Sequence, residues 1–374
     1  MLSWTFVAAA AILCLLPPGI PARLRTWLLA AGSLGAVVLI WHAPLLPLLG
    51  LTLGTYALGR LLPRLAPERR RWLQGIAIAA VVGVLLATRV RGVAVIGLSY
   101  LALKVIQHLV DAGDGRTAAV DLPSLVCTIF FFPTFAAGPI ERTTQFAREL
   151  ERTDRGLGDR LRGLDRIVIG IGKKFLLADP LLAYAHPIFQ EPTIVAPAVL
   201  LSAVYAFAFG LYLDFAGYSD LAIGVARAAG VVVPENFDSP YLARNIGLLW
   251  QRWHMSLTTW LRDYVFISAT RRMLRWTRNP LASQVSGQMI TMVLCGLWHG
   301  LGWNFALWGA YNGAGLGALA VWRHRRGPAP SGTPVRDVLA TLATFHFFAF
   351  GLILFACDLP LARQVVNRLL GFLG

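Results

Sequence analysis

Charged residues are scarce in this sequence, and their scarcity excludes an ordinary soluble protein. Asp, Glu, Lys and Arg make up 14% of the 374 residues, whereas soluble domains contain about 25%. Hydrophobic residues reach 56%, and the mean hydropathy is +0.61. The composition therefore predicts an integral membrane protein.

Cysteines are few and isolated, and none belongs to a C-x-x-C pair. We therefore expect neither a disulfide framework nor a metal site. The first apolar stretch, residues 2 to 16, lacks a basic leader region and an A-x-A cleavage site, so we expect a retained helix. The four cysteines are Cys14, Cys127, Cys295 and Cys357.

Acidic residues are also few, with 19 against 34 basic residues and a net charge of +15. A basic chain can bind nucleic acid, but here Lys and Arg lie in short clusters between apolar runs. Such clusters are typical of cytoplasmic loops, and no zinc-finger or aromatic-basic RNA-binding motif accompanies them. We expect membrane lipid as a partner and no nucleic acid.

Apolar stretches close to the length of a membrane span are abundant. A spanning helix needs about 20 mostly apolar residues. By this measure the sequence predicts an all-α, multi-pass protein with about ten or eleven transmembrane or re-entrant helices. The candidates are 2–20, 27–41, 44–62, 73–88, 93–111, 122–140, 164–184, 194–216, 283–300, 303–322 and 336–357.

One candidate does not fit a simple crossing. If the arginine-rich loop 60–71 is cytoplasmic, alternation places the arginine-rich loop 142–166 outside. Residues 130–139, "FFFPTFAAGP", contain two prolines and a glycine, which break a helix at membrane depth. Because broken backbone is tolerated there only inside protein or beside a wet cavity, this segment predicts a re-entrant element and a cavity.

A long run without charge surrounds one histidine. No Asp, Glu, Lys or Arg occurs from Asn279 to Trp322, a run of roughly 66 Å as a single straight helix. The glycines around His299 are the expected turn, with Trp298 and Trp303 as aromatic walls for the ring. A structural hydrogen bond to a neighbouring helix is one interpretation, and a functional role is the other, because intramembrane ionisable groups are functional candidates.

Residues 234–266 contain a second histidine. Ser239 and Pro240 predict the start of a helix. At helical spacing, its apolar face carries Trp250, His254, Leu257 and Leu261, and its polar face carries Gln251, Arg252, Thr258, Thr259, Arg262 and Asp263. The pattern indicates an amphipathic helix at the interface or inside the bundle, and alone it favours an interfacial anchor.

Two aspartates lie in or beside the preceding apolar segment. Asp214 and Asp220 flank Tyr218 and Ser219 in "GLYLDFAGYSDLAIG". A carboxylate at membrane depth costs about 2.5 to 3.5 kcal/mol, so each needs a partner. We expect Arg244, Arg252 or Arg262 to supply it, in a salt bridge between helices rather than in direct catalysis.

Five motifs in order resemble one family. They are "FFPTFAAGPIER" (131–142), "GIGKKFLLAD" (170–179), "LYLDFAGYSDLAIG" (211–224), "NFDSPYLARNIGLLWQRWHMSLTTWLRDYVF" (236–266) and "GLWHG" (296–300). Together they resemble the membrane-bound O-acyltransferase family, in its bacterial branch of alginate O-acetylation and teichoic-acid D-alanylation proteins. The resemblance divides a single membrane domain into N-terminal helices (1–90) and a family core (91–374).

The resemblance implies a function and a set of site residues. Family members move an acyl group from a thioester to a hydroxyl inside a ring of helices around a central funnel. His299 corresponds to their catalytic histidine, and His254 to a second histidine associated with activity. The residues expected to support the site or line the funnel are Trp298, Asp214, Tyr218, Asp220, Asn236, Arg252, Arg262, Asp263 and Asn312, the last replacing a histidine usual in relatives.

The substrates and setting are likewise implied by the resemblance. We expect no permanently bound cofactor, and a thioester donor that is acetyl-CoA or an acyl carrier with a phosphopantetheine arm. The favoured reaction is acetylation of an extracytoplasmic polysaccharide or glycopolymer at the bacterial inner membrane, together with an extracytoplasmic partner protein. D-alanyl transfer toward a teichoic-acid-like polymer is the alternative, and a transporter or flippase is the alternative of another class.

Overall fold

The computed structural model describes residues 4–14, 19–41, 45–93, 95–117, 120–153, 155–327 and 333–371. All regular secondary structure in these ranges is helical, which confirms the all-α prediction. The chain divides into two compact units. Residues 1–171 and 218–235 form the first, and residues 172–217 and 236–374 form the second. The single membrane domain with a boundary near residue 90 stays a prediction.

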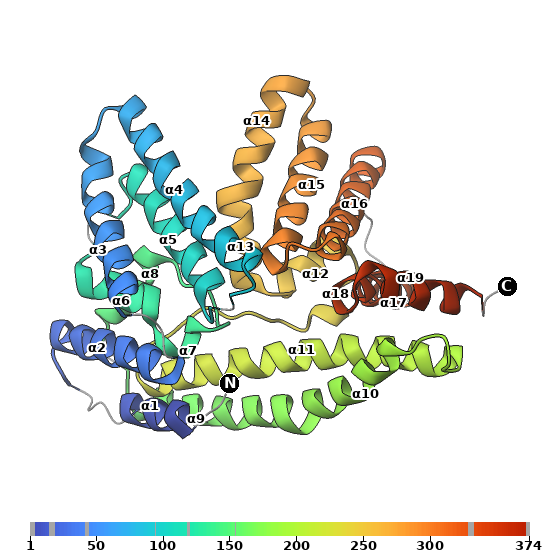
Figure 1. Ribbon diagram of the computed structural model, residues 1–374, viewed down its shortest axis with the longest axis horizontal. Helices are drawn as coiled ribbons and strands as arrows, with labels where there is room; N and C mark the ends of the chain where they lie inside the picture. The colour runs from blue at the N-terminus through green and yellow to red at the C-terminus, as the bar shows by residue number, and fades with distance from the viewer. Residues whose placement is uncertain are drawn as a thin grey trace. The chain divides into compact units, whose positions relative to one another are not determined.

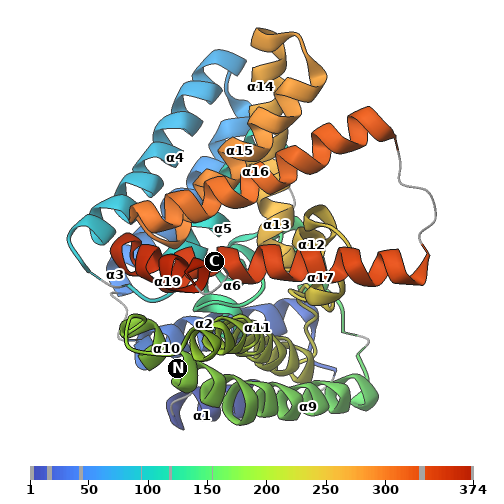
Figure 2. The ribbon, with the colours of Figure 1, turned by 90° about the vertical axis from the view of Figure 1, so that its right-hand side faces the viewer.

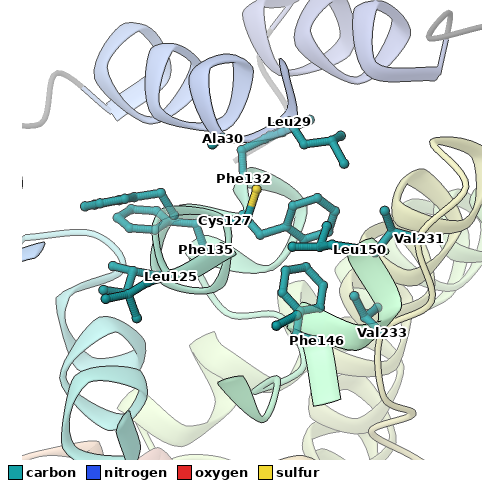
Figure 3. Packing of buried hydrophobic residues seen from close by; sticks show 14 of the residues in the cluster. Leu29, Ala30, Leu125, Cys127, Phe132, Phe135, Phe146, Leu150, Val231 and Val233 are labelled. Atoms are coloured by element: carbon teal, nitrogen blue, oxygen red, sulfur yellow. The ribbon is translucent and has the colours of Figure 1, made fainter. Parts of the chain in front are cut away.

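The first unit is a bundle with its core around two short helices. The core includes residues of α2, α5, α6, α7, α8 and the extended segment after α11, as Figure 3 shows for Leu29, Phe132, Phe146 and Val231. The helices are α1 (Trp4–Cys14), α2 (Ala22–Trp41), α3 (Leu45–Leu61), η1 (Leu62–Arg64), α4 (Pro67–Val90), α5 (Leu98–Gly113), α6 (Leu122–Phe130), α7 (Phe132–Phe135), α8 (Thr143–Leu150) and α9 (Leu157–Ile171).

The predicted break in residues 130–139 is confirmed. Asp121 caps α6 by accepting the N–H of Ser124 at 3.0 Å. The helix stops at Phe131, and Pro133 has no N–H to continue the helical hydrogen-bond ladder. Residues 127–136 are buried, so the broken backbone lies inside protein, the first of the two conditions that tolerate it. The side of the membrane on which this segment enters and leaves stays a prediction.

A buried polar network fastens this segment to α5. Lys104 forms a 2.7 Å ion pair with Glu141, and both side chains are 1% exposed. The hydroxyl of Thr134 donates to the Glu141 carboxylate at 2.5 Å, and Gln107 donates to the Glu141 carbonyl at 2.5 Å. Because each buried charge has a partner, the segment avoids the cost of an isolated ion.

The second unit contains three neighbouring helices, of which α15 and α16 carry the charge-free run. Helices α14, α15 and α16 lie side by side, and α15 packs along α16 (Figures 1 and 2). The elements are η2 (Gly172–Ala178), α10 (Asp179–Gln190), the first part of α11 (Pro197–Ala228), η3 (Pro240–Leu242), α12 (Ile246–Arg252), α13 (Met255–Leu261), η4 (Arg262–Phe266), α14 (Ile267–Thr277), α15 (Pro280–His299), α16 (Trp303–Arg326), α17 (Pro334–Gly351), α18 (Ile353–Ala356) and α19 (Leu359–Leu370).

Among the described residues, four helical stretches are long and apolar enough to cross a membrane. They are Ala22–Trp41, Pro67–Val90, Pro197–Ala228 and Pro334–Ala356. Helix α11 runs well beyond the predicted end at 216, so both Asp214 and Asp220 are helical. The total of ten or eleven crossing or re-entrant elements stays a prediction.

The turn predicted in the charge-free run is confirmed. Helix α15 ends at His299, Gly300 is extended with φ −172°, and α16 begins at Trp303. A histidine therefore sits at the carboxyl end of a helix, directly before a short glycine-rich connection.

The single amphipathic helix predicted from Ser239 is wrong. Ser239 has φ 45° and precedes only the three-residue η3, and α12 begins instead after the Asn245 cap. Helix α12 ends at Arg252, and His254 has φ 42° before α13 starts at Met255. His254 therefore lies at a sharp break rather than on a continuous apolar stripe.

Candidate functional site

Aromatic rings surround the imidazole of His299. The ring centroid lies 4.8 Å from that of Trp298, 5.5 Å from Trp308 and 5.0 Å from Phe355, each in an edge-to-face arrangement. The side chain is partly exposed. The predicted aromatic wall is confirmed for Trp298, whereas Trp303 is 77% exposed, and Trp308 and Phe355 form the remaining wall. Three rings therefore contact an imidazole that is not fully buried.

Glycines bring the two helices of the site into backbone contact. A Cβ on Gly296 would lie 2.1 Å from the carbonyl oxygen of Phe305, and one on Gly309 would lie 2.3 Å from the carbonyl oxygen of Met292. Such close approach is the usual role of small residues between membrane helices. It sets α15 against α16 so that His299 meets Trp308.

His254 is buried at the break between α12 and α13. Its side chain is 2% exposed, and its ring packs edge-to-face on Phe215 with centroids 4.6 Å apart. The backbone before it is held in place because the N–H of Asp238 donates to the carbonyl of Arg252 at 3.0 Å. The left-handed conformation at residue 254 is uncommon for a residue with a side chain, and such conformations cluster at functional sites.

Asn236 anchors the start of α13 next to this histidine. Its side-chain oxygen accepts the Ser256 hydroxyl at 2.6 Å, and its backbone carbonyl accepts the N–H of Met255 at 2.9 Å. Asn236 is completely buried. It therefore acts on the site by fixing the backbone on which His254 sits.

One indole joins the two histidines. The Trp298 ring centroid lies 6.4 Å from that of His254 and 4.8 Å from that of His299. The structure thus brings His254 close to Trp298 and His299, which belong to a separate sequence motif. Within the described ranges, no three His, Cys, Asp or Glu side chains are grouped as a metal would require.

The partners predicted for the two aspartates are wrong. Asp214 pairs with Lys174 of the π-helix η2 at 2.5 Å, and Lys174 also pairs with Asp179 at 2.6 Å. Asp220 belongs to the first unit and pairs with Arg166 of α9 at 2.5 Å. Both pairs join elements that are distant in sequence, as expected of structural salt bridges between helices.

The other candidate residues do not converge on one point. Tyr218 lies in the first unit and donates its hydroxyl to the carbonyl of Pro133 at 3.4 Å. Arg262 pairs with its neighbour Asp263 at 2.9 Å on an exposed surface. Arg252 is half-buried at the end of α12. Asn312 is buried in α16, and its amide donates to the Trp308 carbonyl one turn earlier at 2.9 Å.

A groove of about 920 Å³ runs between α12, α13, α15 and α16. Its lining includes the cationic residues Arg262, Arg278 and Arg323 and, deeper along α15, Thr291 and Met292. Met292 lies seven residues before His299, about 10 Å along the helix. The groove thus combines cationic side chains with a stretch of α15 that ends about 10 Å before His299.

Trp250 also lines this groove. Its ring lies 5.8 Å from that of Trp308, which itself contacts His299. The Trp250 indole N–H is buried and has no hydrogen-bond partner among the described residues. A ligand acceptor in the groove could satisfy this donor, because buried polar groups are normally hydrogen-bonded.

Sequence reasoning missed several residues that shape the site. Trp308 and Phe355 form part of the His299 wall, and Lys174 holds Asp214. Trp308 lies one helical turn before Asn312, which was already a candidate residue. Helical spacing after the break at His299 could therefore have pointed to Trp308 from the sequence. Phe355 comes from a different helix, and only the folded arrangement reveals its contact.

Comparisons with known proteins identify the family of this chain. The sequence model of the MBOAT, membrane-bound O-acyltransferase family, matches residues 89–357. The chain is 34% identical over 272 residues to the teichoic acid D-alanyltransferase of Bacillus subtilis (strain 168), covering 70% of this chain and 68% of that protein. It is 35% identical over 250 residues to a probable alginate O-acetylase of Azotobacter vinelandii, covering 66% of this chain and 48% of that protein.

A third relative is the peptidoglycan O-acetyltransferase of Helicobacter pylori, which is 30% identical over 250 residues, covering 66% of this chain and 46% of that protein. The chain thus matches about half the length of the two O-acetylating relatives. Because the family match spans both motif histidines and more than half of the residues, this chain belongs to the membrane-bound O-acyltransferase family.

Proposed function

We propose that the protein is a membrane acyltransferase that moves an acyl group from a thioester to a hydroxyl, with His299 as the general base. The observation that carries the proposal is the placement of His299 at a helix break, where three aromatic rings contact a side chain that is partly exposed. An imidazole with fixed orientation and an accessible edge is suited to proton transfer.

The reaction balances without another reagent. His299 takes the proton of the acceptor hydroxyl as its oxygen bonds to the thioester carbonyl carbon. The tetrahedral intermediate then collapses, the carbon–sulfur bond breaks, and the proton returns to the thiolate. Neutral imidazole is available near pH 7, and general-base catalysis contributes typically about 10² to 10⁴-fold.

His254 supports this base indirectly in the proposal. The Trp298 indole contacts both imidazoles, so His254 fixes one wall of the His299 ring. This role makes His254 a positioning residue, held in turn by Asn236 through the start of α13.

The groove between α12 and α16 supports a thioester donor with a phosphate group. Its arginines suit phosphate oxygens, which guanidinium groups bind in bidentate fashion. Coenzyme A and a carrier-borne phosphopantetheine arm both carry phosphate and a thioester. The donor's carbonyl would lie beyond Trp250, whose ring contacts Trp308 beside His299.

Acetyl is the acyl group that we propose, with D-alanyl as the second candidate. Two relatives are named for O-acetylation, of alginate and of peptidoglycan. The D-alanyltransferase of teichoic acid favours the second candidate, because the match covers a larger share of that relative. In either case we propose an envelope polysaccharide or glycopolymer as acceptor, at the bacterial cytoplasmic membrane, with an extracytoplasmic partner.

The test compares wild type with His299→Ala in nanodiscs. Each protein receives radiolabelled acetyl-CoA or, separately, a D-alanyl-loaded carrier, and thioester loss is followed. We expect His299→Ala to lower consumption of one donor at least 100-fold, toward background, because the general base is lost. His186→Ala is the matched control, since His186 is an exposed histidine on α10.

Histidine-dependent loss of acetyl-CoA supports acetyl transfer, and loss of only the D-alanyl carrier supports the second candidate. Full activity in a folded His299→Ala protein contradicts the general-base assignment. Transport of a labelled glycolipid with no thioester consumption would instead favour the transporter or flippase alternative.

A further inference from the structure

An apolar groove lies in the first unit, on helices that the functional site does not use. Helices α3 and α4 both pack on α5 (Figure 1), and a cavity of about 520 Å³ lies between them. Its lining includes Leu51 and Leu58 of α3, Val81 and Val84 of α4, and Val105 of α5. Because the family match begins at residue 89, α3 and nearly all of α4 lie outside it.

The polar side chains of this lining are already satisfied. The hydroxyl of Thr55 donates to the Leu51 carbonyl at 2.7 Å, and that of Thr88 donates to the Leu85 carbonyl at 2.9 Å. Neither threonine therefore requires a polar ligand. The groove is suited to hydrocarbon.

Two glycines of α3 open the groove. A Cβ on Gly50 or Gly54 would meet no atom within 4 Å, although both residues line the cavity. Glycine inside a helix is less favourable than alanine by about 0.8–1.0 kcal/mol. The usual compensation between membrane helices is close packing, which the described residues do not provide here. These glycines instead leave room.

The length of the cavity fits one hydrocarbon chain. Along α4 the lining extends from Ala77 to Thr88, about 17 Å at the helical rise. That length is close to half of the roughly 30 Å hydrocarbon thickness, the depth of one lipid leaflet.

Positive charge gathers beyond one end of the groove. Residues 60–71, which comprise the end of α3, its connection to α4 and the start of α4, contain five arginines, and Trp72 beside them is 70% exposed. Tryptophan prefers the level of lipid headgroups, and arginine binds phosphate well. The arginines are Arg60, Arg64, Arg69, Arg70 and Arg71.

We propose that this groove binds one acyl chain of an anionic phospholipid, and that the phospholipid headgroup lies at the arginines of residues 60–71. The apolar lining, the length of one leaflet and the unfilled glycines specify the chain. The arginines and Trp72 specify the charge and depth of the headgroup. The site is independent of the acyl-transfer reaction.

The experiment uses phosphatidylglycerol with a photoreactive diazirine in one acyl chain, reconstituted with the full chain in nanodiscs. Irradiation and peptide mass spectrometry locate the adducts. We expect them on α3, α4 and α5 at the groove. The double variant Gly50→Leu/Gly54→Leu fills part of the groove and should displace about two methylene groups of the lipid chain. Because each buried methylene contributes about 0.8 kcal/mol to binding, labelling should fall about ten-fold.

Gly83→Leu is the matched control. Gly83 is also a helical glycine with open surroundings, and it does not line the groove. The replacements all raise helix propensity, so folding is retained and labelling in the control stays at the wild-type level. Phosphatidylcholine with the same chain labels several-fold less than phosphatidylglycerol.

Three results would overturn the proposal. The first is unchanged labelling in the double variant, which would show that the chain does not occupy the groove. The second is equal labelling by the two lipids, which would show that the site does not select an anionic headgroup. The third is a wild-type dimer that becomes monomeric in the double variant, which would assign the groove to a second copy.

Discussion

Replacing Gly296 by alanine tests whether the contact of α15 with α16 sets the position of His299. The added Cβ would lie 2.1 Å from the Phe305 carbonyl oxygen, a backbone atom that cannot rotate away. An unstrained contact needs about 3.5 Å, so the helices must shift by about 1 Å locally. His299 lies less than one turn further along α15 and moves with it.

The expected result is a loss of activity accompanied by a loss of stability. A displacement of about 1 Å at a reacting group costs roughly 10²-fold in rate, equivalent to about 2.7 kcal/mol of barrier. Overpacking destabilises the fold by typically 1–3 kcal/mol. The assay measures His299-dependent loss of acetyl-CoA and of the D-alanyl carrier, beside thermal unfolding in the same nanodiscs.

Gly317→Ala is the matched control on the same helix pair. Its Cβ would lie 3.1 Å from the end of the Val285 side chain, which can adjust. We expect activity within about two-fold of wild type, as for a well-tolerated small change. If folded Gly296→Ala retains more than a third of wild-type activity, the close helix contact does not position His299.

Three further predictions concern buried contacts. Asn236→Ala removes the acceptor of the Ser256 hydroxyl, so thermal unfolding should show a loss of about 1–3 kcal/mol in stability, and kcat should fall. An unchanged kcat would contradict the role of Asn236 in positioning His254. Lys104→Met leaves Glu141 buried without its ion-pair partner and should lower the stability of the fold by about 3–5 kcal/mol, whereas the double variant Lys104→Met/Glu141→Gln should recover most of that loss. If the single and double variants are equally stable, the ion pair does not stabilise the fold. At the left-handed position 254, His254→Gly should be more stable than His254→Ala by about 1 kcal/mol, with kcat lowered in both; greater stability of the alanine variant would refute the conformational argument.

Sequence alone predicted the features that depend on local chemistry. Gly296 to Gly302 signalled the turn after His299, because a charge-free run of that length cannot remain one helix within a bilayer. Pro133 likewise marked the end of α6. In both places the backbone rule is local, and no distant residue can reverse it.

The conformation of His254 depends on distant residues and escaped prediction. The stretch from Trp250 to Leu261 has the spacing of one amphipathic helix, yet the chain breaks inside it. The Asn236 carbonyl accepts the N–H of Met255, and Phe215 packs on the imidazole. These contacts override the local helical pattern.

The partners of the aspartates were unpredictable for the same reason. Lys174 and Arg166 lie 40 and 54 residues away from Asp214 and Asp220. Charge complementarity required a cation for each carboxylate, but several arginines satisfied that condition equally. Only the packing of η2 and α9 selects between them.

The short, buried helices α6 and α7 have a consequence for how the chain enters the membrane. Nine residues of α6 reach only about 14 Å, less than half the hydrocarbon thickness. Alone in lipid, this segment would expose unsatisfied backbone, and Lys104 and Glu141 would each lack a counterion. Insertion of α5 is therefore coupled to that of residues 122–141, and the two must leave the translocation machinery as one unit.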